Sequence, residues 1–319
     1  MPTDAQPLPI VAVVGATAAG KTGLSLDLAT DLGGEIVNTD AMQLYRGMDV
    51  GTAKLPPAQR RGIPHHLLDR LDVTETATVA DFQGWAREEI DDIRARGRVP
   101  VLVGGSALYT RAILDRFEFP GTDESVRREL EGELAGVGPR VLHQRLADLD
   151  PDAAAKIGPE NGRRIVRALE VIALTGRPYS ASLPAPTYAD PRSMQIGVDI
   201  DRPTLDARIE TRVREMYDAG LVEEVERLLD LGLERGQTAR RAIGYREAIA
   251  FLRGEISRDQ AVVQTQAATR RFARRQDGWF RKDPRVVWVR FDDESRVEQA
   301  VAAVHALDRS VPADQGRRN

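Results

Sequence analysis

The first hundred residues alternate short apolar runs with longer segments of helical periodicity. Residues 9–15 read PIVAVVG and predict a buried strand, whereas KTGLSLDLATDLGG at 21–34 has the apolar spacing of a helix that ends at two glycines. EIVNTD at 35–40 predicts a second strand, VADFQGWAREEIDDIRARG at 79–97 an amphipathic helix, and VPVLVGG at 99–105 a third strand. Strands that alternate with helices indicate an α/β fold, with a parallel sheet covered by helices on both faces.

From about Asp123 the pattern changes, because three helical segments follow one another without a strand. They are ESVRRELEGELAG, PRVLHQRLADLD and ENGRRIVRALEVIALTG, and the proline-rich PYSASLPAPTYADP ends the series. We expect a small all-helical insertion domain at 122–185, between two parts of a P-loop NTPase-like core at 1–121 and 186–319. The core resumes with a strand, MQIGVDID, and the helix TLDARIETRVREMYDAG. A long arginine-rich helix, the strand VVWVRFD and an amphipathic helix complete it.

The composition narrows the class of protein. The 319 residues contain no cysteine, which excludes disulfides and cysteine-based metal sites, and they carry a formal net charge of -4. No apolar run approaches the roughly 18 residues of a membrane helix, so we expect a cytoplasmic protein, and nothing in the chain requires more than a monomer. The charge is uneven: residues 270–290 hold eight basic side chains against two acidic ones, as a local nucleic-acid surface requires.

The stretch GATAAGKT at 15–22 fits the pattern G-x-x-x-x-G-K-[ST] of a phosphate-binding P-loop. Its glycines allow the backbone to wrap an anion, Lys21 balances the anion's charge, and the hydroxyl of Thr22 can hold Mg²⁺. The predicted strand before the motif and the helix after it provide the context that a P-loop needs. The residues expected to bind phosphate are Gly15, Ala16, Thr17, Ala18, Ala19, Gly20, Lys21 and Thr22.

Three segments should converge on one crevice, because ligands bind at the carboxyl ends of parallel strands. They are the P-loop, Asp40 after the second strand and Ser106 after the third. Asp40 either caps the following turn or acts as a general base that faces the phosphate site. The third strand ends in Gly-Gly-Ser, whereas an NTPase usually has an aspartate there to support Mg²⁺, which weakens a hydrolase interpretation. A P-loop kinase of a small metabolite and a nucleotide-responsive RNA-binding module stay open.

Seven segments, in this order along the chain, resemble those of the tRNA dimethylallyltransferases, also called tRNA isopentenyltransferases. They are GATAAGKT, TDAMQLYRGMDVGTAK, IPHHLLD, VLVGGSALY, RRIVRALEV, AIGYREAI and ATRRFARRQDGWFRKD. The resemblance implies transfer of a dimethylallyl group from dimethylallyl diphosphate to N6 of adenosine at tRNA position 37, next to the anticodon, with diphosphate leaving and Mg²⁺ as cofactor. The anticodon stem-loop would be the RNA partner. Related enzymes prenylate free adenine nucleotides, but the helical insertion with its arginine face favours tRNA.

The resemblance also implies roles for individual residues. Lys21, Thr22 and Arg212 would stabilise the departing diphosphate, with Thr22 near the metal, and Asp40 would take a proton from the adenine amino group. The adenine would have to be flipped out of the anticodon loop to reach them. The residues implied to contact tRNA are Asp40, Ala41, Met42, Gln43, Ser106, Arg127, Arg163, Arg164, Arg167, Arg241, Arg246, Arg271 and Arg275.

Two positions depart from the commonest family pattern, which has serine at Ala41 and threonine at Ser106. Ser106 keeps a hydroxyl, whereas Ala41 lacks a hydrogen-bonding group that another residue would have to replace. On spacing alone, Arg163 and Arg167 form an ordinary solvated helix face, and only the resemblance favours RNA contact.

The arginine-rich segment RRFARRQDGWFRKDPR also contains Phe272, Trp279 and Phe280. Arginine interleaved with aromatic residues suits a surface that binds phosphates and stacks on bases. The same aromatic side chains could instead pack into the core.

Overall fold

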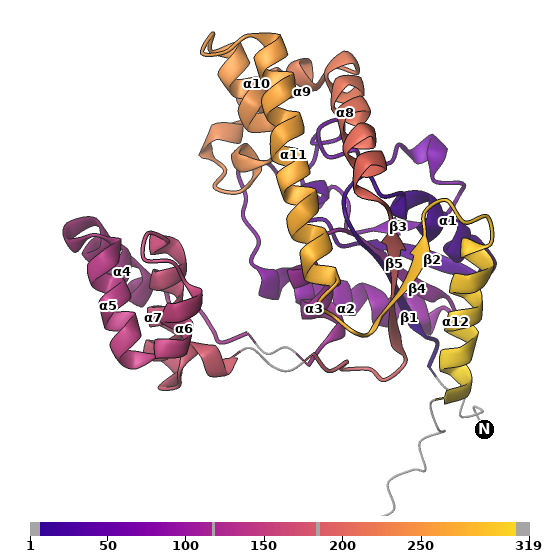
Figure 1. The fold of residues 1–319 in the computed structure, drawn as a ribbon, viewed down its shortest axis with the longest axis horizontal. Coiled ribbons are helices and arrows are strands. Elements are labelled where there is room, and N and C mark those ends of the chain that lie inside the picture. The colour runs from indigo at the N-terminus through magenta and orange to yellow at the C-terminus, as the bar shows by residue number, and fades with distance from the viewer. Residues whose placement is uncertain (1–6, 117–118, 183–185, 311–319) are drawn as a thin grey trace, which may run out of the picture. The chain divides into compact units, whose positions relative to one another are not determined.

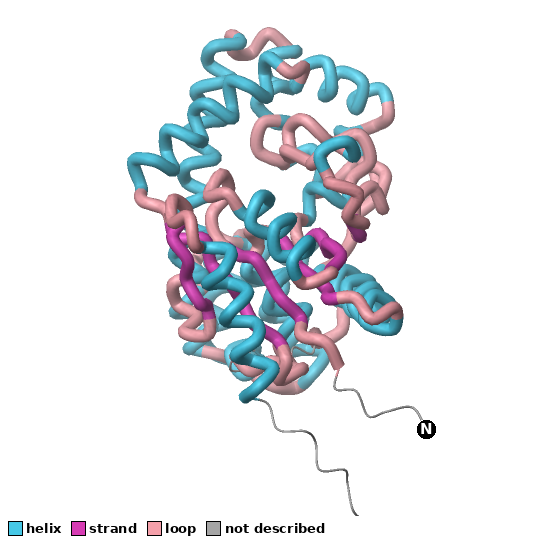
Figure 2. The backbone as a smooth tube through the Cα atoms, turned by 90° about the vertical axis from the view of Figure 1, so that its right-hand side faces the viewer, coloured by secondary structure: helices cyan, strands magenta, loops and turns pink. Residues whose placement is uncertain are grey.

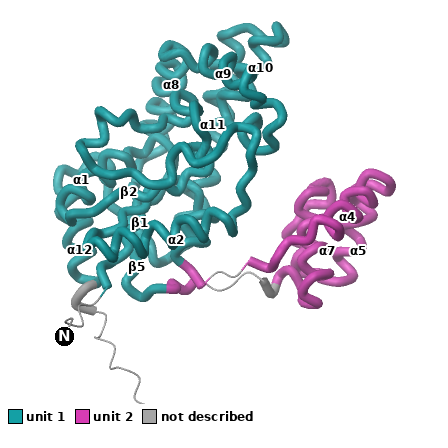
Figure 3. The backbone as a smooth tube through the Cα atoms, turned by 180° about the vertical axis from the view of Figure 1, so that it is seen from behind, with its two compact units in different colours: residues 1–114, 190–319 teal, residues 115–189 magenta. Residues whose placement is uncertain are grey.

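The structure is a computed structural model that describes residues 7–116, 119–182 and 186–310. The chain forms two compact units (Figure 3), of which the first comprises Met1–Leu114 and Asp190–Asn319 and the second Asp115–Ala189. The second unit is therefore an insertion into the first.

The second unit takes in a few more residues on each side than the predicted insertion at 122–185. Asp115 pairs with Tyr188 in an isolated β-bridge, and the backbone N–H of Arg116 donates to the carbonyl of Thr187 at 3.0 Å. The entering and leaving segments thus bind each other, which is why the unit begins before its first helix.

A six-stranded sheet, all of whose neighbouring pairs are parallel, forms the centre of the first unit as described (Figure 1). Across the sheet the order is β3 (His65–His66), β2 (Gly34–Asn38), β4 (Val99–Val103), β1 (Ile10–Val14), β5 (Ser193–Asp199) and β6 (Val286–Arg290). β1 lies between β4 and β5, with Val13 opposite both Val103 and Ile196. The predicted fold class, a parallel P-loop-like sheet flanked by helices, is confirmed.

Both faces of the sheet are covered, which explains the uninterrupted apolar runs of its strands. α1 (Lys21–Asp31) and α12 (Arg296–Ser310) share one hydrophobic cluster with the strands, whereas α2 (Val79–Ala95) buries a different set around Phe82. The crossover from β1 to β2 contains α1 and the crossover from β3 to β4 contains α2. They run in opposite directions along the sheet, so right-handed connections place the two helices on opposite faces. Tyr109 of α3 (Ala107–Leu114) packs edge-on against Phe82, with ring centroids 4.7 Å apart.

Four further helices of the first unit pack together and lie above the strands in the view of Figure 2. They are α8 (Arg202–Asp218), α9 (Leu221–Asp230), α10 (Tyr245–Leu252) and α11 (Arg258–Phe280), the last being the predicted arginine-rich helix. Short 3-10 turns occupy Ala41–Leu44, Pro57–Gln59, Leu233–Arg235 and Ala239–Arg241. No helix within the described ranges has both the length and the apolar character needed to cross a membrane.

The second unit consists mainly of helices in its described residues. They are α4 (Glu124–Val137), α5 (Pro139–Leu149), α6 (Pro151–Lys156), α7 (Gly162–Thr175) and a 3-10 turn at Tyr179–Ser182. Asp123 caps α4 by accepting the N–H groups of Ser125 and Val126, and prolines open α5 and α6, where an N–H has no partner within the helix. A separate hydrophobic cluster, which includes Leu142, Leu146 and Ile165, gives the unit its own core.

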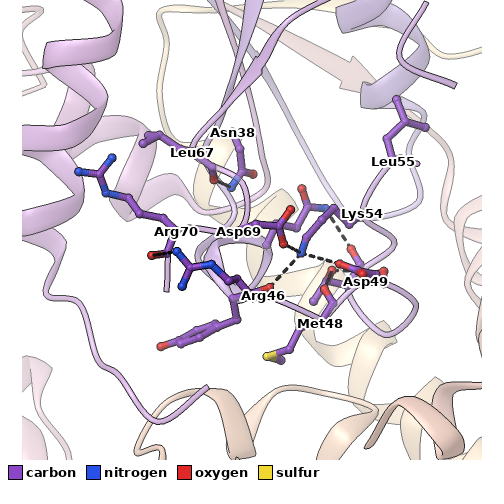
Figure 4. Close-up of polar contacts among 12 residues, drawn as sticks. Asn38, Arg46, Met48, Asp49, Lys54, Leu55, Leu67, Asp69 and Arg70 are labelled. Atoms are coloured by element: carbon purple, nitrogen blue, oxygen red, sulfur yellow. Dashed lines mark hydrogen bonds and ion pairs between the residues drawn. The ribbon is translucent and has the colours of Figure 1, made fainter. Parts of the chain in front are cut away.

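Lys54 holds the loop that follows β2. Its side chain is only 3% exposed and donates to the carboxylates of Asp49 and Asp69 at 2.6 Å each, and to the carbonyl of Tyr45 at 2.9 Å (Figure 4). A buried ammonium needs such partners, because an unpaired one would lose its hydration without compensation.

Glu224 of α9 holds the same loop through its backbone. The carboxylate accepts the N–H groups of Asp49, Val50 and Gly51 at 3.0, 2.8 and 3.2 Å. It also accepts the hydroxyl of Tyr245 at 2.6 Å, and burial together with this carboxylate raises the pKa of Tyr245, which keeps the hydroxyl a donor. The loop is therefore tied to the helices α9 and α10.

Replacing Glu224 with glutamine should lower the free energy of unfolding by about 1–3 kcal/mol, because an amide nitrogen would then face backbone donors that need an acceptor. Urea denaturation would measure the loss, and Glu226→Gln, an exposed change on the same helix, is the matched control. Equal stability of the two variants would show that the three amides do not depend on the carboxylate.

Candidate active site

The P-loop spans Gly15–Thr22 between β1 and α1, as the motif requires. Gly15 has φ 132° and Gly20 has φ 107°, values that favour glycine, and Ala18 adopts a left-handed φ of 63°. α1 begins directly after Gly20, so its first N–H groups and its positive dipole end are available to an anion. The backbone is thus shaped for phosphate before any ligand binds.

Lys21 lies over the P-loop, where its positive charge is unfavourable. Its ammonium donates to the carbonyls of Gly15 and Ala16 at 3.1 and 2.8 Å. Burial and the nearby guanidinium of Arg212 lower the pKa of Lys21 to about 8, although Asp40 acts in the opposite direction. A bound anion would supply the counter-charge that the site lacks.

Arg212 of α8 is the second cation of the site. Burial lowers its pKa, and Arg208 one turn earlier contributes, although Glu215 acts in the opposite direction. Arg208 is held elsewhere, because it donates to the carbonyl of Ala19 at 3.3 Å and lies over the ring of Phe291. Arg212 has no hydrogen-bond or ion-pair partner within the described residues, which leaves its guanidinium available to a ligand.

Asp40 follows β2, where it caps the following turn and also lines the cavity, so the two alternatives that the sequence offered do not exclude each other. One carboxylate oxygen accepts the N–H of Met42 at 2.9 Å and so caps the 3-10 turn Ala41–Leu44, while the side chain also lines the cavity beside the P-loop. Asn38 holds the backbone of Asp40, since its side chain accepts the N–H of Asp40 and donates to that residue's carbonyl. Burial raises the pKa of Asp40, while the Met42 N–H and Lys21 oppose that rise. A raised pKa makes this carboxylate a stronger base.

The cavity between these groups has a volume of about 300 Å³. It lies where the carboxyl ends of β1, β2 and β4 meet, as expected of a parallel sheet. Its lining comprises Thr17, Ala18, Gly20, Lys21, Thr22, Gly23, Asn38, Asp40, Gln43, Thr52, Ala53, Val103, Gly104, Gly105, Arg212 and Gln276. Ser106 is outside this lining, although the two glycines before it belong to it.

Sequence reasoning missed several lining residues, among them Thr52, Ala53 and Gln276. Gln43 was expected at the site, and its side chain donates to the carbonyl of Thr52 at 3.0 Å. No local pattern marks Gln276, which reaches the cavity from α11. The only sequence signal for it was its place inside an arginine-rich helix.

The arginines expected to contact RNA differ in their exposure and in their partners within the protein. In the first unit, Arg241, Arg246, Arg271 and Arg275 are exposed, although Arg246 also pairs with Glu247 at 2.5 Å. Trp279 of α11 is 60% exposed, whereas Phe280 of the same helix is buried in the core. The exposed residues of α11 therefore combine cations with one accessible aromatic ring.

In the second unit, Arg163 and Arg164 are exposed, but Arg167 is not free as its helix face suggested. Its guanidinium donates to Glu170 at 2.8 Å and to the carbonyls of Pro120 and Gly121. Arg127 also pairs with Glu170 at 2.8 Å. Because Glu170 is completely buried, it needs both cations, and they hold the start of α4 to α7.

Comparison with known proteins shows what the chain is similar to. A family model described as IPP transferase matches residues 43–283. A tRNA dimethylallyltransferase of Nocardioides sp. is 70% identical over 298 residues, which cover 93% of this chain and 96% of that protein.

Two solved structures share the fold. The full-length tRNA isopentenylpyrophosphate transferase of Bacillus halodurans is 39% identical with a TM-score of 0.69, over 94% of this chain and 97% of that one. A eukaryotic dimethylallyltransferase acting on tRNA is 25% identical with a TM-score of 0.81, over 97% of this chain and 82% of that one.

Anion binding should weaken as the pH rises above 8. The pKa of Lys21 in the free protein is about 8, so at higher pH the site must take up a proton to bind an anion. We expect Kd for inorganic diphosphate, measured by calorimetry, to rise by up to about tenfold per pH unit above that value. Lys21→Arg keeps its charge and controls for the ligand's own titration. Identical pH dependence of the two proteins would contradict the assignment to Lys21.

Proposed function

The chain belongs to the IPP transferase family, and on this premise we propose that it transfers a dimethylallyl group from dimethylallyl diphosphate to N6 of adenosine 37 in tRNA, releasing diphosphate. The observation that carries the proposal is one cavity with an anion-binding P-loop and Arg212 beside the carboxylate of Asp40. We further propose that the protein acts as a monomer.

The donor side of the reaction needs positive charge. When the allylic C–O bond breaks, its electron pair leaves with the diphosphate and positive charge develops on the prenyl carbon. Lys21, Arg212 and the N–H groups at the start of α1 stabilise the departing diphosphate. The depressed pKa values of Lys21 and Arg212 support this role, since both side chains gain a counter-charge when the anion forms.

A magnesium ion fits beside the P-loop. Thr22 is exposed at the first turn of α1, lines the cavity and offers a hydroxyl oxygen. Mg²⁺ prefers oxygen ligands and is usually held by one or two protein groups together with substrate phosphates and water. When bound, it would neutralise charge on the diphosphate oxygens. Lys21 and the loop amides hold the remaining oxygens.

The acceptor side needs a base. The lone pair of the adenine amino group is delocalised into the ring, so removal of a proton must accompany formation of the N6–carbon bond. Asp40 is placed to accept that proton, and its raised pKa supports this role. Gln43 also lines the cavity and would orient the base.

An adenine inside a stacked anticodon loop cannot enter such a cavity, so the base must be flipped out at a cost of a few kcal/mol. We propose that phosphate contacts offset this cost. The exposed arginines that would make them are Arg241, Arg246, Arg271 and Arg275 in the first unit and Arg163 and Arg164 in the second. Trp279 could add stacking.

The deciding experiment incubates the protein with unmodified tRNA, Mg²⁺ and either dimethylallyl diphosphate labelled in its prenyl group or γ-labelled ATP. Label should enter tRNA from the first donor and no phosphoryl group should move from the second. Phosphoryl transfer to a small metabolite would instead support a P-loop kinase. Prenylation of free adenine nucleotides in place of tRNA would identify the related class of enzyme.

Replacing Asp40 with asparagine should lower kcat by about 10²–10⁴, because the amide cannot accept the proton. The amide oxygen can still accept the N–H of Met42, so the cap and the melting temperature should be retained. Asp40→Ala removes both functions and should lose stability as well. Near-normal turnover by Asp40→Asn would exclude proton transfer to this residue.

Replacing Arg271 or Arg275 with glutamine should weaken tRNA binding and reduce the slope of log Kd against log salt concentration by about 1 for each phosphate group that the variant no longer binds. Arg98, an exposed residue before the amino end of β4, is the control, because it lies at the opposite end of the strand from the cavity. If the slope equals that of Arg98→Gln, Arg271 and Arg275 do not contact RNA phosphates.

A further inference from the structure

Gln276 joins two backbone segments that line the cavity, the P-loop and the turn after β4. It belongs to α11, is 5% exposed and lines the cavity. Its side-chain oxygen accepts the N–H of Thr17 in the P-loop at 2.8 Å. Its side-chain nitrogen donates to the carbonyl of Gly105 after β4 at 2.9 Å. One amide group thus satisfies one backbone donor and one backbone acceptor.

The segment after β4 is packed tightly against this side chain. A Cβ atom added at Gly105 would collide with the amide nitrogen of Gln276, and one added at Gly104 would collide with Thr39. The two glycines therefore let the backbone pass between β2 and α11. Their fixed position depends on a side chain that comes from far along the sequence.

The sheet alone does not fix the distance between the two segments. The ladder between β1 and β4 pairs Val13 with Val103 and continues with the N–H of Gly104, which donates to Val13 at 3.3 Å. Within the described residues, the other hydrogen bonds that join the P-loop to the turn after β4 are the two that Gln276 makes. A missing or shifted glutamine would let the two walls move independently.

We propose that Gln276 is a positioning residue for the transfer reaction, which sets the P-loop against the turn after β4 and so fixes the bound diphosphate relative to the rest of the cavity. The inference rests on the proposed function. Gln276 acts through the backbone of Thr17 and Gly105 and leaves the charges of the site unchanged. A displacement of about 1 Å between reacting groups can cost about 10²-fold in rate.

Gln276→Met tests the proposal, because it keeps a side chain of similar length and removes both hydrogen bonds. Gln266→Met is the matched control: Gln266 is on the same helix, is 7% exposed and donates to the carbonyl of Glu210 at 3.1 Å. It lies ten residues earlier, about 15 Å along the helix. Both changes bury a thioether in place of an amide, but Gln276→Met also leaves the N–H of Thr17 and the carbonyl of Gly105 without this partner and should cost more stability.

For Gln276→Met we expect Kd for inorganic diphosphate with Mg²⁺ to rise about tenfold and kcat/KM for the prenyl donor to fall by about 10–100-fold. The melting temperature should fall below that of Gln266→Met, and the Kd for tRNA should not change. Equal diphosphate affinity of the two variants, measured at a temperature where both are folded, would overturn the proposal.

Gln276→Glu is the second variant, in case the methionine form does not fold. Its carboxylate still accepts the N–H of Thr17 but meets the carbonyl of Gly105 without a proton to donate, so kcat/KM should fall and the melting temperature should fall as well. Unchanged kcat/KM would also overturn the proposal. Diphosphate binding is measured without turnover. If the parent protein fails to prenylate tRNA, the proposed function is refuted, but the Kd values for diphosphate still decide the role of Gln276.

Discussion

Two cations that face one small cavity impose the constraint on which the site depends. Lys21 and Arg212 are partly removed from water, repel each other and have lowered pKa values. Asp40 opposes this shift for Lys21, but a single carboxylate does not balance two positive groups. Such an arrangement costs stability in the free protein and is relieved by an anion with more than one negative charge. The unbalanced positive charge of Lys21 and Arg212 thus explains both the affinity for diphosphate and the loss of stability in the free protein.

The parallel sheet brings a different chemical group to the cavity from each of three neighbouring strands. The P-loop follows β1, Asp40 follows β2, and two glycines, which have no side chain, follow β4. In a nucleotide hydrolase the last position usually carries an aspartate that serves Mg²⁺ and water. Here the carboxylate is on the neighbouring strand, where it can meet an acceptor other than water. A shared phosphate loop therefore supports a different reaction.

Local sequence patterns predicted five of the described strands, the helices α1 and α2 and the P-loop, because periodicity and glycine spacing act over a few residues. The two-residue strand β3 was not predicted. The rule of strand ends placed Asp40 near the cavity, and its residue type offered a turn cap or a base as alternatives. The sequence did not reveal that the capping side chain also lines the cavity. Gln276 escaped prediction because it contacts Thr17, 259 positions away. Arg167 was misjudged as free for a related reason: its ion pair with Glu170 lies on its own helix, but the carbonyls it also binds come from an earlier segment.

The place of the insertion has a consequence during synthesis on the ribosome. β1 is a central strand, yet one of its two neighbours, β5, is translated only after the whole second unit. At about 5–20 residues per second, the nascent chain exposes the open edge of β1 for several seconds. Unpaired edges of apolar strands invite association with other chains. The helical unit has its own core and can fold during this interval. The chain before it and the chain after it are then joined by a folded unit until β5 pairs with β1.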